Sequence, residues 1–502
     1  MKVSQRRRHA LSLASLAVVL GAAGCSMAPP YERPSLPQIP SAFREASEKQ
    51  IVFDGMRAKD GVAEETLEGQ WWTVFDDVAL NRIEQQAQEA NQDLKAALAR
   101  VKQSRAMNEA ARASLFPTLD AGFGPTRQKL SAVSQFQPDG TNIPVQTLWR
   151  AQARVSYEAD LFGQVASRID AAKADAEQND ALYRAVRLAL QADVAQNYFA
   201  LRDLDAQAGV LDRTVDLRKR ALQLVQRRFD HGEISELDVS RAKTELANAH
   251  SDAMTVRRMR AATEHGLAVL MGQTPEAFSM PSHALEPVSV RIPAGLPSSL
   301  LQRRPDIAAA ERMMAAANAR IGAAKAAFFP MLELTGAGGF ESATLADLFR
   351  WSSRVFLLGP LAGAALTVPI FDGGRRQGNL DRAYAVYEED VARYRQQVLT
   401  AFREVEDSLS DLRILEDQLD TQSDALKASE RAAQLSSKQY SEGAISYIDV
   451  IDTERTLLQA RRALIQLQGR KANQTVELIR ALGGGWDKAV PPPDTGVNVA
   501  QK

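Results

Sequence analysis

The residues best placed to do chemistry in this chain are carboxylates beside two short turns. The stretches Gly232–Val239 and Gly443–Val450 share the pattern Gly-x-Ile-Ser-x-x-Asp-Val and lie 211 residues apart in a chain of 502. A serine followed three residues later by an acid fits a capping box, so Asp238 and Asp449 are expected at helix starts. Asp452 lies one helical turn after Asp449, on the same face, and has no such capping role.

Composition argues against several other kinds of site. The chain has five histidines and one cysteine, which excludes an internal disulfide and disfavours a His/Cys metal cluster. It has no Gly-x-x-x-x-Gly-Lys loop for binding nucleotide phosphates. The formal charge is −1, from 61 basic and 62 acidic residues, whereas a nucleic-acid binder has a basic face. We therefore expect no enzyme activity, no cofactor, no metal and no nucleic-acid partner.

The single cysteine, Cys25, ends an apparent export signal. A basic start at residues 6–8 and an apolar run precede the small residues 22–24. This arrangement resembles a bacterial lipoprotein signal, which predicts removal of residues 1–24 and acylation of Cys25 as a membrane anchor. Ser26 follows instead of the Asp that marks inner-membrane retention, so the signal resembles an outer-membrane address. An ordinary secretory signal with an incidental cysteine is the alternative.

The turns are positioned by long helical patterns. Residues 163–230 and 372–440 carry apolar residues at steps of three and four without an internal proline. A helix of that length would reach roughly 100 Å, beyond the usual size of a globular domain. A shorter helical pattern follows each turn, at 236–271 and up to Leu482, where glycines end it. A further helix is predicted over 78–115.

Strand-like stretches interrupt the helical ones. Residues 145–161 alternate apolar and polar over a run that is long for a sandwich strand. Trp149 and Tyr157 share its apolar face about 26 Å apart, close to the spacing of aromatic girdles in outer-membrane barrels. A sandwich strand with a hydrated polar face is the alternative. Other predicted strands begin at Leu119, span Met331–Phe340, and span 359–371.

The order helix, two strands, long helix, turn, helix occurs twice, which predicts an internal two-fold repeat. The predicted divisions of the chain are a signal peptide (1–24), a lipid-anchored tether and equatorial segment (25–77), repeat 1 (78–290), repeat 2 (291–485) and a flexible C-terminal tail (486–502).

Four strands cannot close a barrel, and an open sheet edge in lipid leaves backbone groups unpaired. Two copies would make only the narrowest barrel, whereas three copies give twelve strands. The sequence therefore predicts an α+β membrane protein: a trimeric twelve-stranded β-barrel continued by a twelve-helix, coiled-coil-like α-barrel. A non-conducting coiled-coil lipoprotein scaffold is the alternative.

A set of motifs, in this order and spacing, resembles TolC-type outer-membrane efflux factors, specifically the lipoprotein branch that serves resistance-nodulation-division pumps. The motifs are Cys25 with Pro30–Pro34, Trp71–Asp77 leading to Leu80, Asn91–Leu94, Arg303–Ile307, Glu311-Arg312, Ala319–Gly322, Phe328–Pro330, Pro369–Arg375 and the Gly443 turn. The resemblance implies a homotrimer in the outer membrane that extends into the periplasm and is closed at its periplasmic end. It implies a passive export duct for small molecules, partnered by outer-membrane lipid, a periplasmic adaptor and an inner-membrane transporter. The duct of a type I protein secretion system is the nearby alternative.

The resemblance also assigns residues to the periplasmic end. The implied gate residues are Asp449, Asp452, Asp238 and Tyr440, and the implied adaptor-docking tip consists of Gly232, Ile234, Gly443 and Ile445. Ile445 departs from the best-known member of the family, which has a basic residue just after the turn glycine. We therefore expect apolar contacts and tyrosine packing to hold the gate in place of salt bridges.

Overall fold

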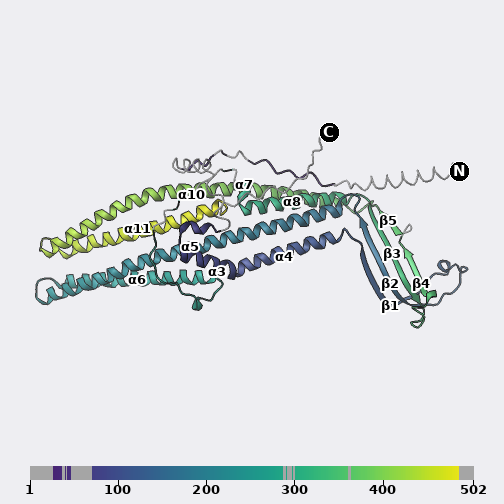
Figure 1. Cartoon of the computed structure of the whole chain (residues 1–502), viewed down its shortest axis with the longest axis horizontal. Coiled ribbons are helices and arrows are strands. Elements are labelled where there is room, and N and C mark those ends of the chain that lie inside the picture. The colour runs from purple at the N-terminus through teal and green to yellow at the C-terminus, as the bar shows by residue number, and fades with distance from the viewer. Residues whose placement is uncertain are drawn as a thin grey trace. The chain divides into compact units, whose positions relative to one another are not determined.

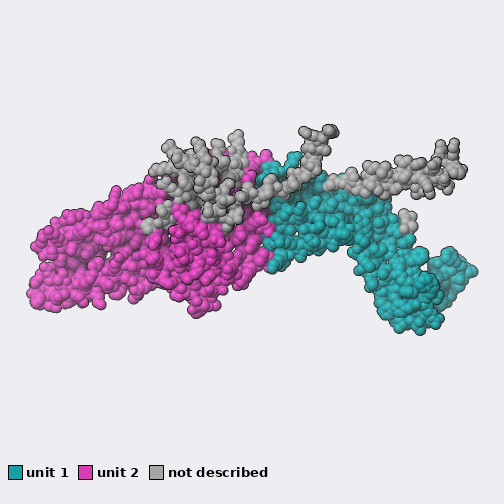
Figure 2. Space-filling model, in the orientation of Figure 1, with its two compact units in different colours: residues 1–34, 100–179, 310–394 teal, residues 35–99, 180–309, 395–502 magenta. Residues whose placement is uncertain are grey.

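The computed structural model describes residues 27–36, 40, 42–46, 70–286, 290, 297, 300–359 and 363–484. The chain divides into two compact units, each assembled from three separate stretches (Figure 2). Unit 1 comprises residues 1–34, 100–179 and 310–394, and unit 2 comprises residues 35–99, 180–309 and 395–502. Cys25, the signal peptide and the C-terminal tail lie outside the described residues.

Two pairs of helices, each joined by one of the turns, account for much of the chain (Figure 1). The first pair is α5 (Gln164–Asp230) with α6 (Glu236–Leu270), and the second is α10 (Arg375–Ser441) with α11 (Tyr447–Ala481). The longer member has 67 residues and the shorter has 35 in both pairs. The expected long helices and the helices after each turn are confirmed.

The predicted single helix over 78–115 is wrong, because the structure contains α3 (Val78–Ala90) and α4 (Gln92–Ala113) in its place. The side chain of Asn91 causes the break. Its Oδ1 accepts a hydrogen bond from the backbone N of Leu94 at 2.9 Å, and its Nδ2 donates to the carbonyl of Leu270 at 2.9 Å. Asn91 therefore caps the start of α4 and ties it to the end of α6.

The second half has a corresponding break between α7 (Leu300–Arg303) and α8 (Pro305–Ala326). A glycine lies against the backbone at each break. Gly272 has φ +65°, and a Cβ there would lie 2.5 Å from the carbonyl oxygen of Ala90; Gly483 has φ +94° and would lie 3.1 Å from that of Arg303. Both positions need glycine for conformation and for space. The glycine cap predicted after the last helix is confirmed.

Unit 1 contains an antiparallel sheet with the order β1-β2-β3-β4, in which β5 also pairs with β3 (Figure 1). The strands are β1 (Thr118–Gln128), β2 (Gln146–Ala159), β3 (Met331–Ser342), β4 (Arg354–Leu358) and β5 (Ala364–Thr367). Within the described residues, the outer edges of β1 and of β4 and β5 have no strand partner. An open antiparallel sheet therefore presents two free edges.

The strand predicted over 145–161 is confirmed as β2, and its register separates two faces. Tyr157 pairs with Leu334, and Ala151 pairs with Phe123 and Phe340, so apolar residues share one face. The opposite face carries charges, including Arg150, whose Nε lies 2.6 Å from Glu341 Oε2.

The continuous strand predicted over 359–371 is wrong. In the described part of that range the strand present is the short β5, since β4 ends before Gly359 and residues 360–362 lie outside the described residues. The backbone N of Gly359 donates to the carbonyl of Thr335 at 3.2 Å, and Gly363 has φ +95°. A Cβ on Gly359 would lie 1.9 Å from Thr335 Oγ1. These close approaches interrupt the strand, which is a usual role of glycine in a sheet.

The N-terminal segment 27–36 is irregular, as expected of a tether. It is nevertheless fastened to α8 within unit 1. Arg33 Nη2 lies 2.6 Å from Glu311 Oε2, and Asn318 Nδ2 donates to the carbonyl of Pro29 at 2.9 Å. A Cβ on Gly322 would lie 2.6 Å from that of Ala28, so the segment follows the helix surface closely.

Candidate gate at the helical turns

The two turns in unit 2 have the same backbone conformation. Gly232 has φ +79° and Gly443 has φ +76°, and nothing lies within 4 Å of a Cβ built on either. The left-handed conformation alone therefore requires glycine. In both turns the glycine N donates to the carbonyl three residues earlier, and the next residue donates to the carbonyl five residues earlier. The bonds are Gly232 N to Phe229 O and Glu233 N to Arg228 O in the first turn, and Gly443 N to Tyr440 O and Ala444 N to Gln439 O in the second.

The expected capping role of Asp449 is confirmed at the start of α11. The backbone N and the hydroxyl of Ser446 both donate to Asp449 Oδ2, at 3.0 and 2.7 Å. These bonds favour the ionised carboxylate, so they lower the pKa of Asp449 below its ordinary value. At the start of α6, the Ser235 hydroxyl donates to Asp238 Oδ2 at 3.1 Å.

Asp452 lies on the exposed surface of α11. Its side chain is 65% exposed, and its nearest cation, Arg455 Nη1, is 3.8 Å away. The position 211 residues earlier holds Arg241, whose Nη1 lies 3.4 Å from Asp238 Oδ1. The first turn therefore pairs an acid with a base at the two positions where the second turn has two acids.

An apolar cluster holds the two turns together within unit 2. Its buried members are Val225 of α5, Val239 and Ala242 of α6, and Tyr447, Val450 and Ile451 of α11, with Ile234, Tyr440 and Ile445 packed against them. The rings of Tyr440 and Tyr447 are 5.6 Å apart, and Arg228 lies 5.1 Å from the Tyr440 ring. Ile445 and Tyr440 thus make apolar contacts inside one chain, while their role in a gate stays a prediction.

A buried ionic cluster next to these turns was missed by the sequence reasoning. Arg218 of α5 pairs with Glu454 of α11, and its Nη2 lies 3.5 Å from Oε2 of Glu245 in α6. Glu245 also accepts from Arg455 Nε at 3.1 Å. The side chains of Arg218 and Glu245 are only 4% and 7% exposed. Ionic contacts therefore join three helices beside the apolar cluster.

The signal for this cluster was present in the helical pattern. Leu211, Val215, Leu222 and Val225 follow steps of three and four, and Arg218 occupies the step between Val215 and Leu222. A charged residue in an apolar stripe is buried and must find a partner of opposite charge. The partners lie on helices distant in sequence, so their identity needed the structure.

Burial sets the protonation of two groups in this region. It raises the pKa of the Tyr447 phenol to about 12. It also raises the pKa of Glu454 above its ordinary value, although the positive charge of Arg218 acts in the opposite direction. Within the described residues the hydroxyls of Tyr440 and Tyr447 have no hydrogen-bond partner. Both tyrosines therefore contribute through ring packing.

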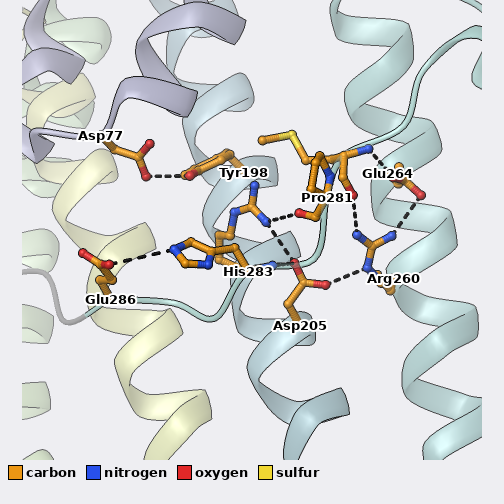
Figure 3. A network of polar contacts seen from close by, with 10 residues as sticks. Asp77, Tyr198, Asp205, Arg260, Glu264, Pro281, His283 and Glu286 are labelled. Atoms are coloured by element: carbon orange, nitrogen blue, oxygen red, sulfur yellow. Dashed lines mark hydrogen bonds and ion pairs between the residues drawn. The ribbon is translucent and has the colours of Figure 1, made fainter.

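A second polar network, elsewhere in unit 2, fastens the segment after α6 to the helices (Figure 3). Asp205 of α5 accepts from Arg260 Nε at 2.6 Å and from the backbone N of His283 at 3.1 Å. Arg260 Nη2 also donates to the carbonyl of Met280 at 2.7 Å. Nearby, the Tyr198 hydroxyl donates to Asp77 at 2.5 Å; burial, followed by this bond, raises the pKa of Tyr198 to about 12. Arg260 and Asp205 therefore hold the backbone of the segment after α6, while Tyr198 bonds the side chain of Asp77.

No group of three or more His, Cys, Asp or Glu side chains in the described ranges is placed to hold a metal ion. Among the helices of those same ranges, none combines the length and apolar character needed to cross a membrane.

Residues 83–273 and 296–484 each contain one long helix, one turn and one shorter helix, and both blocks match the outer membrane efflux protein family. The chain belongs to that family, as the motifs predicted. It is an outer-membrane channel component of an efflux system.

Curated relatives match the chain over nearly its full length. The toluene efflux pump outer membrane protein TtgF of Pseudomonas putida is 32% identical over 492 residues, covering 98% of this chain and all of the relative. The cation efflux system protein CusC of Escherichia coli is 32% identical, covering 94% of this chain and 98% of the relative. The crystal structure of the open state of the MtrE outer membrane channel of Neisseria gonorrhoeae is 29% identical, with a TM-score of 0.77 over 92% of this chain and 99% of that one.

Proposed function

We propose that three copies of this chain form a passive export duct for small molecules, anchored in the outer membrane and extending into the periplasm. The observation that carries the proposal is the sheet, which has one apolar face, one charged face and two free edges. Joining such sheets edge to edge in lipid leaves no backbone group unpaired. Because β4 and β5 pair with successive segments of the same edge of β3, each sheet is four strands wide, and three sheets give the twelve-stranded barrel. The paired helices continue it as a twelve-helix barrel.

The two pairs of equal-length helices support the proposed internal repeat, with repeat 1 at 78–290 and repeat 2 at 291–485. The tether at 25–77 follows a signal peptide at 1–24 and begins at a lipidated Cys25. The close approach of Gly322 to Ala28 and the hydrogen bond from Asn318 to the carbonyl of Pro29 support this proposal, because they hold the start of the tether along the end of α8 that leads to β3, near the strands where an acyl chain would meet the outer-membrane lipid.

The proposed gate lies at the turns, where Asp449 and Asp452 of three copies line the constriction and Asp238 and Tyr440 support it. Two observations support this assignment: the Asp452 side chain is 65% exposed on α11, and the bonds from Ser446 lower the pKa of Asp449, which favours its ionised form. Rings of carboxylates attract cations and exclude anions. The apolar cluster containing Ile445 supports packing instead of a basic lock at that position.

The proposed partners are a periplasmic adaptor, docking at Gly232, Ile234, Gly443 and Ile445, and an inner-membrane resistance-nodulation-division transporter that supplies the energy. The names of the relatives, which refer to efflux pumps and a cation efflux system, support a pump over a protein secretion system.

Single-channel recording in planar bilayers tests the duct and its gate together. The wild-type protein should conduct with cation selectivity, whereas a non-conducting scaffold would give no channels. Replacing Asp449→Ala and Asp452→Ala together should raise conductance and reduce cation selectivity. Unchanged conductance and selectivity in the double variant would remove these residues from the gate, while leaving the duct itself intact.

A further inference from the structure

Two aromatic rings in unit 1 stack where the helices connect to the strands of the sheet. Phe162 lies in the connection from β2 to α5, and Phe329 lies in the connection from α8 to β3. Their ring centroids are 4.9 Å apart with an interplanar angle of 21°, a stacked arrangement. A strand-to-helix connection from the first half of the chain therefore packs on a helix-to-strand connection from the second half.

The described residues contain one more connection from an α-helix to a strand and one more from a strand to an α-helix. Phe116 lies between α4 and β1, 213 residues before Phe329, and each of the two is followed by proline. Ile370 and Phe371 lie between β5 and α10, as Leu161 and Phe162 lie between β2 and α5. Phe116 is 69% exposed and Phe371 is 90% exposed. Neither ring packs on another aromatic ring within the described part of the chain.

The strand directions bring these two connections together in neighbouring copies. β1 and β3 run in one direction and β2, β4 and β5 in the other, and β1 and β5 lie toward opposite edges of the sheet (Figure 1). If the β5 edge of one copy faces the β1 edge of the next, those edges are antiparallel. The end of β5 then lies beside the start of β1, as the end of β2 lies beside the start of β3 within the chain.

We propose that Phe371 of one copy packs on Phe116 of the next copy, which repeats between chains the Phe162–Phe329 stack found within each chain. The inference rests on the proposed homotrimer and deepens it by naming a contact through which copies recognise each other. Around the barrel, the Phe162–Phe329 pair within each chain alternates with the Phe371–Phe116 pair between chains. The same head-to-tail contact repeats at each interface and closes the assembly. Two large exposed apolar side chains, Ile370 and Phe371, are thereby withdrawn from water.

Cysteine cross-linking of the full-length protein in outer-membrane vesicles tests this contact. The double variant Phe116→Cys with Phe371→Cys should give covalent dimers and trimers when treated with a short thiol-specific bismaleimide, whose length spans the gap that two stacked rings leave between cysteine side chains. The matched internal pair Phe162→Cys with Phe329→Cys should give an intramolecular cross-link with the same reagent. Each single variant should remain monomeric on a denaturing gel. The matched control joins Phe371→Cys with Phe136→Cys, which replaces a 98% exposed side chain in the β1–β2 loop and should not cross-link.

The outcomes separate the aromatic contact from the trimer. A trimeric native mass in detergent without a cross-linked ladder overturns the Phe116–Phe371 contact and leaves the homotrimer standing. A native mass of one copy overturns both. If the ring faces lipid instead, brominated phospholipid will quench the fluorescence of Phe371→Trp more than that of the wild type, whose native tryptophans include Trp149, and this overturns the contact; we expect no quenching beyond the wild-type level.

Substitution by serine provides an independent measurement. Phe116→Ser and Phe371→Ser should each lower the temperature at which the trimer dissociates, and the double variant should lower it no further than the more severe single variant. Additive effects of the two substitutions would contradict a shared contact. Phe136→Ser should leave the dissociation temperature unchanged.

Discussion

At the turn after α5, Asp238 lies 3.4 Å from Arg241; at the turn after α10, the corresponding positions hold Asp449 and Asp452. The backbones of the two turns nevertheless match in glycine conformation, in the extended N-cap serines and in main-chain hydrogen bonds, although only Ser446 and Asp449 form a complete capping box. The ionic cluster is likewise unequal: Arg218 and Glu245 join Glu454 of α11, whereas the positions 211 residues after Arg218 and Glu245 hold the uncharged Ser429 and Thr456. The two turns therefore share a backbone conformation but differ in the charges beside it.

The largest expected effect comes from removing the cation at the centre of the ionic cluster. Arg218→Ala leaves Glu245 buried without its partner from α5, which should reduce the free energy of unfolding by about 3–5 kcal/mol. Hydrogen exchange should increase in peptides covering residues 440–455. Ser429→Ala, at the corresponding position of the second half, is the matched control and should change stability by less than about 0.5 kcal/mol. Equal losses of stability in Arg218→Ala and Ser429→Ala would show that these two corresponding positions do not differ in their contribution to folding.

Alanine at the turn glycines tests whether the two backbones are equivalent. Gly232→Ala and Gly443→Ala should each cost about 1 kcal/mol of stability, since φ is positive and nothing else lies near the new Cβ. Thermal unfolding of the two variants would measure this cost. Gly209→Ala, inside α5 with open space around it, should instead stabilise by up to about 1 kcal/mol. If the two alanine variants lose very different amounts of stability, the backbones of the two turns are not equivalent.

Making the first turn acidic tests the charge difference directly. Arg241→Asp places two acids after Gly232, as after Gly443, and should increase the cation selectivity of single channels. The reversal potential in a salt gradient measures this change. Arg241→Gln removes the positive charge without adding a negative one, and it should shift the reversal potential less than Arg241→Asp does. No shift with Arg241→Asp would mean that the first turn does not face the conducting path.

The smallest expected effect is a pH shift. The Ser446 bonds lower the folded-state pKa of Asp449, so their stabilising contribution is present above the ordinary carboxyl pKa and is lost as pH falls through the lowered value. Ser446→Ala should raise this pKa, and cation selectivity should then decline at a higher pH than in the wild type. Reversal potentials measured between pH 3 and 6 follow the change. Ser235→Ala should leave this profile in place, because Asp449 is unaffected.

Much of the fold was predictable from the sequence because its local signals agree with one another. Apolar steps without an internal proline predicted α5 and α10, and an alternation of apolar and polar residues, interrupted at Leu148, predicted β2. The two incorrect elements share one physical cause, which is contact with residues distant in sequence. Asn91 ends α3 by bonding Leu270, and Gly359 interrupts a strand by approaching Thr335. Neither partner is visible from the local pattern.

In the candidate gate, the sequence predicted those contacts that form between residues close together on one helix. The Ser446–Asp449 cap follows from spacing along one helix, and its geometry agrees. The Arg218, Glu245 and Glu454 cluster joins three helices, so only the unusual place of Arg218 in an apolar stripe was visible beforehand. The second polar network depends on the segment after α6, whose irregular course has no periodic signal.

The matched helix lengths have a consequence for how this architecture can change in size. Both shorter helices contain 35 residues, or five heptads, and both longer ones contain 67 residues. Losing one heptad from a single helix would displace its end by about 10 Å and place its turn out of step with the other. A shorter variant therefore requires the same deletion in α5, α6, α10 and α11, each keeping its heptad face. The lengths of the four helices are therefore coupled, and an insertion or deletion is tolerated only when all four helices change by the same number of residues.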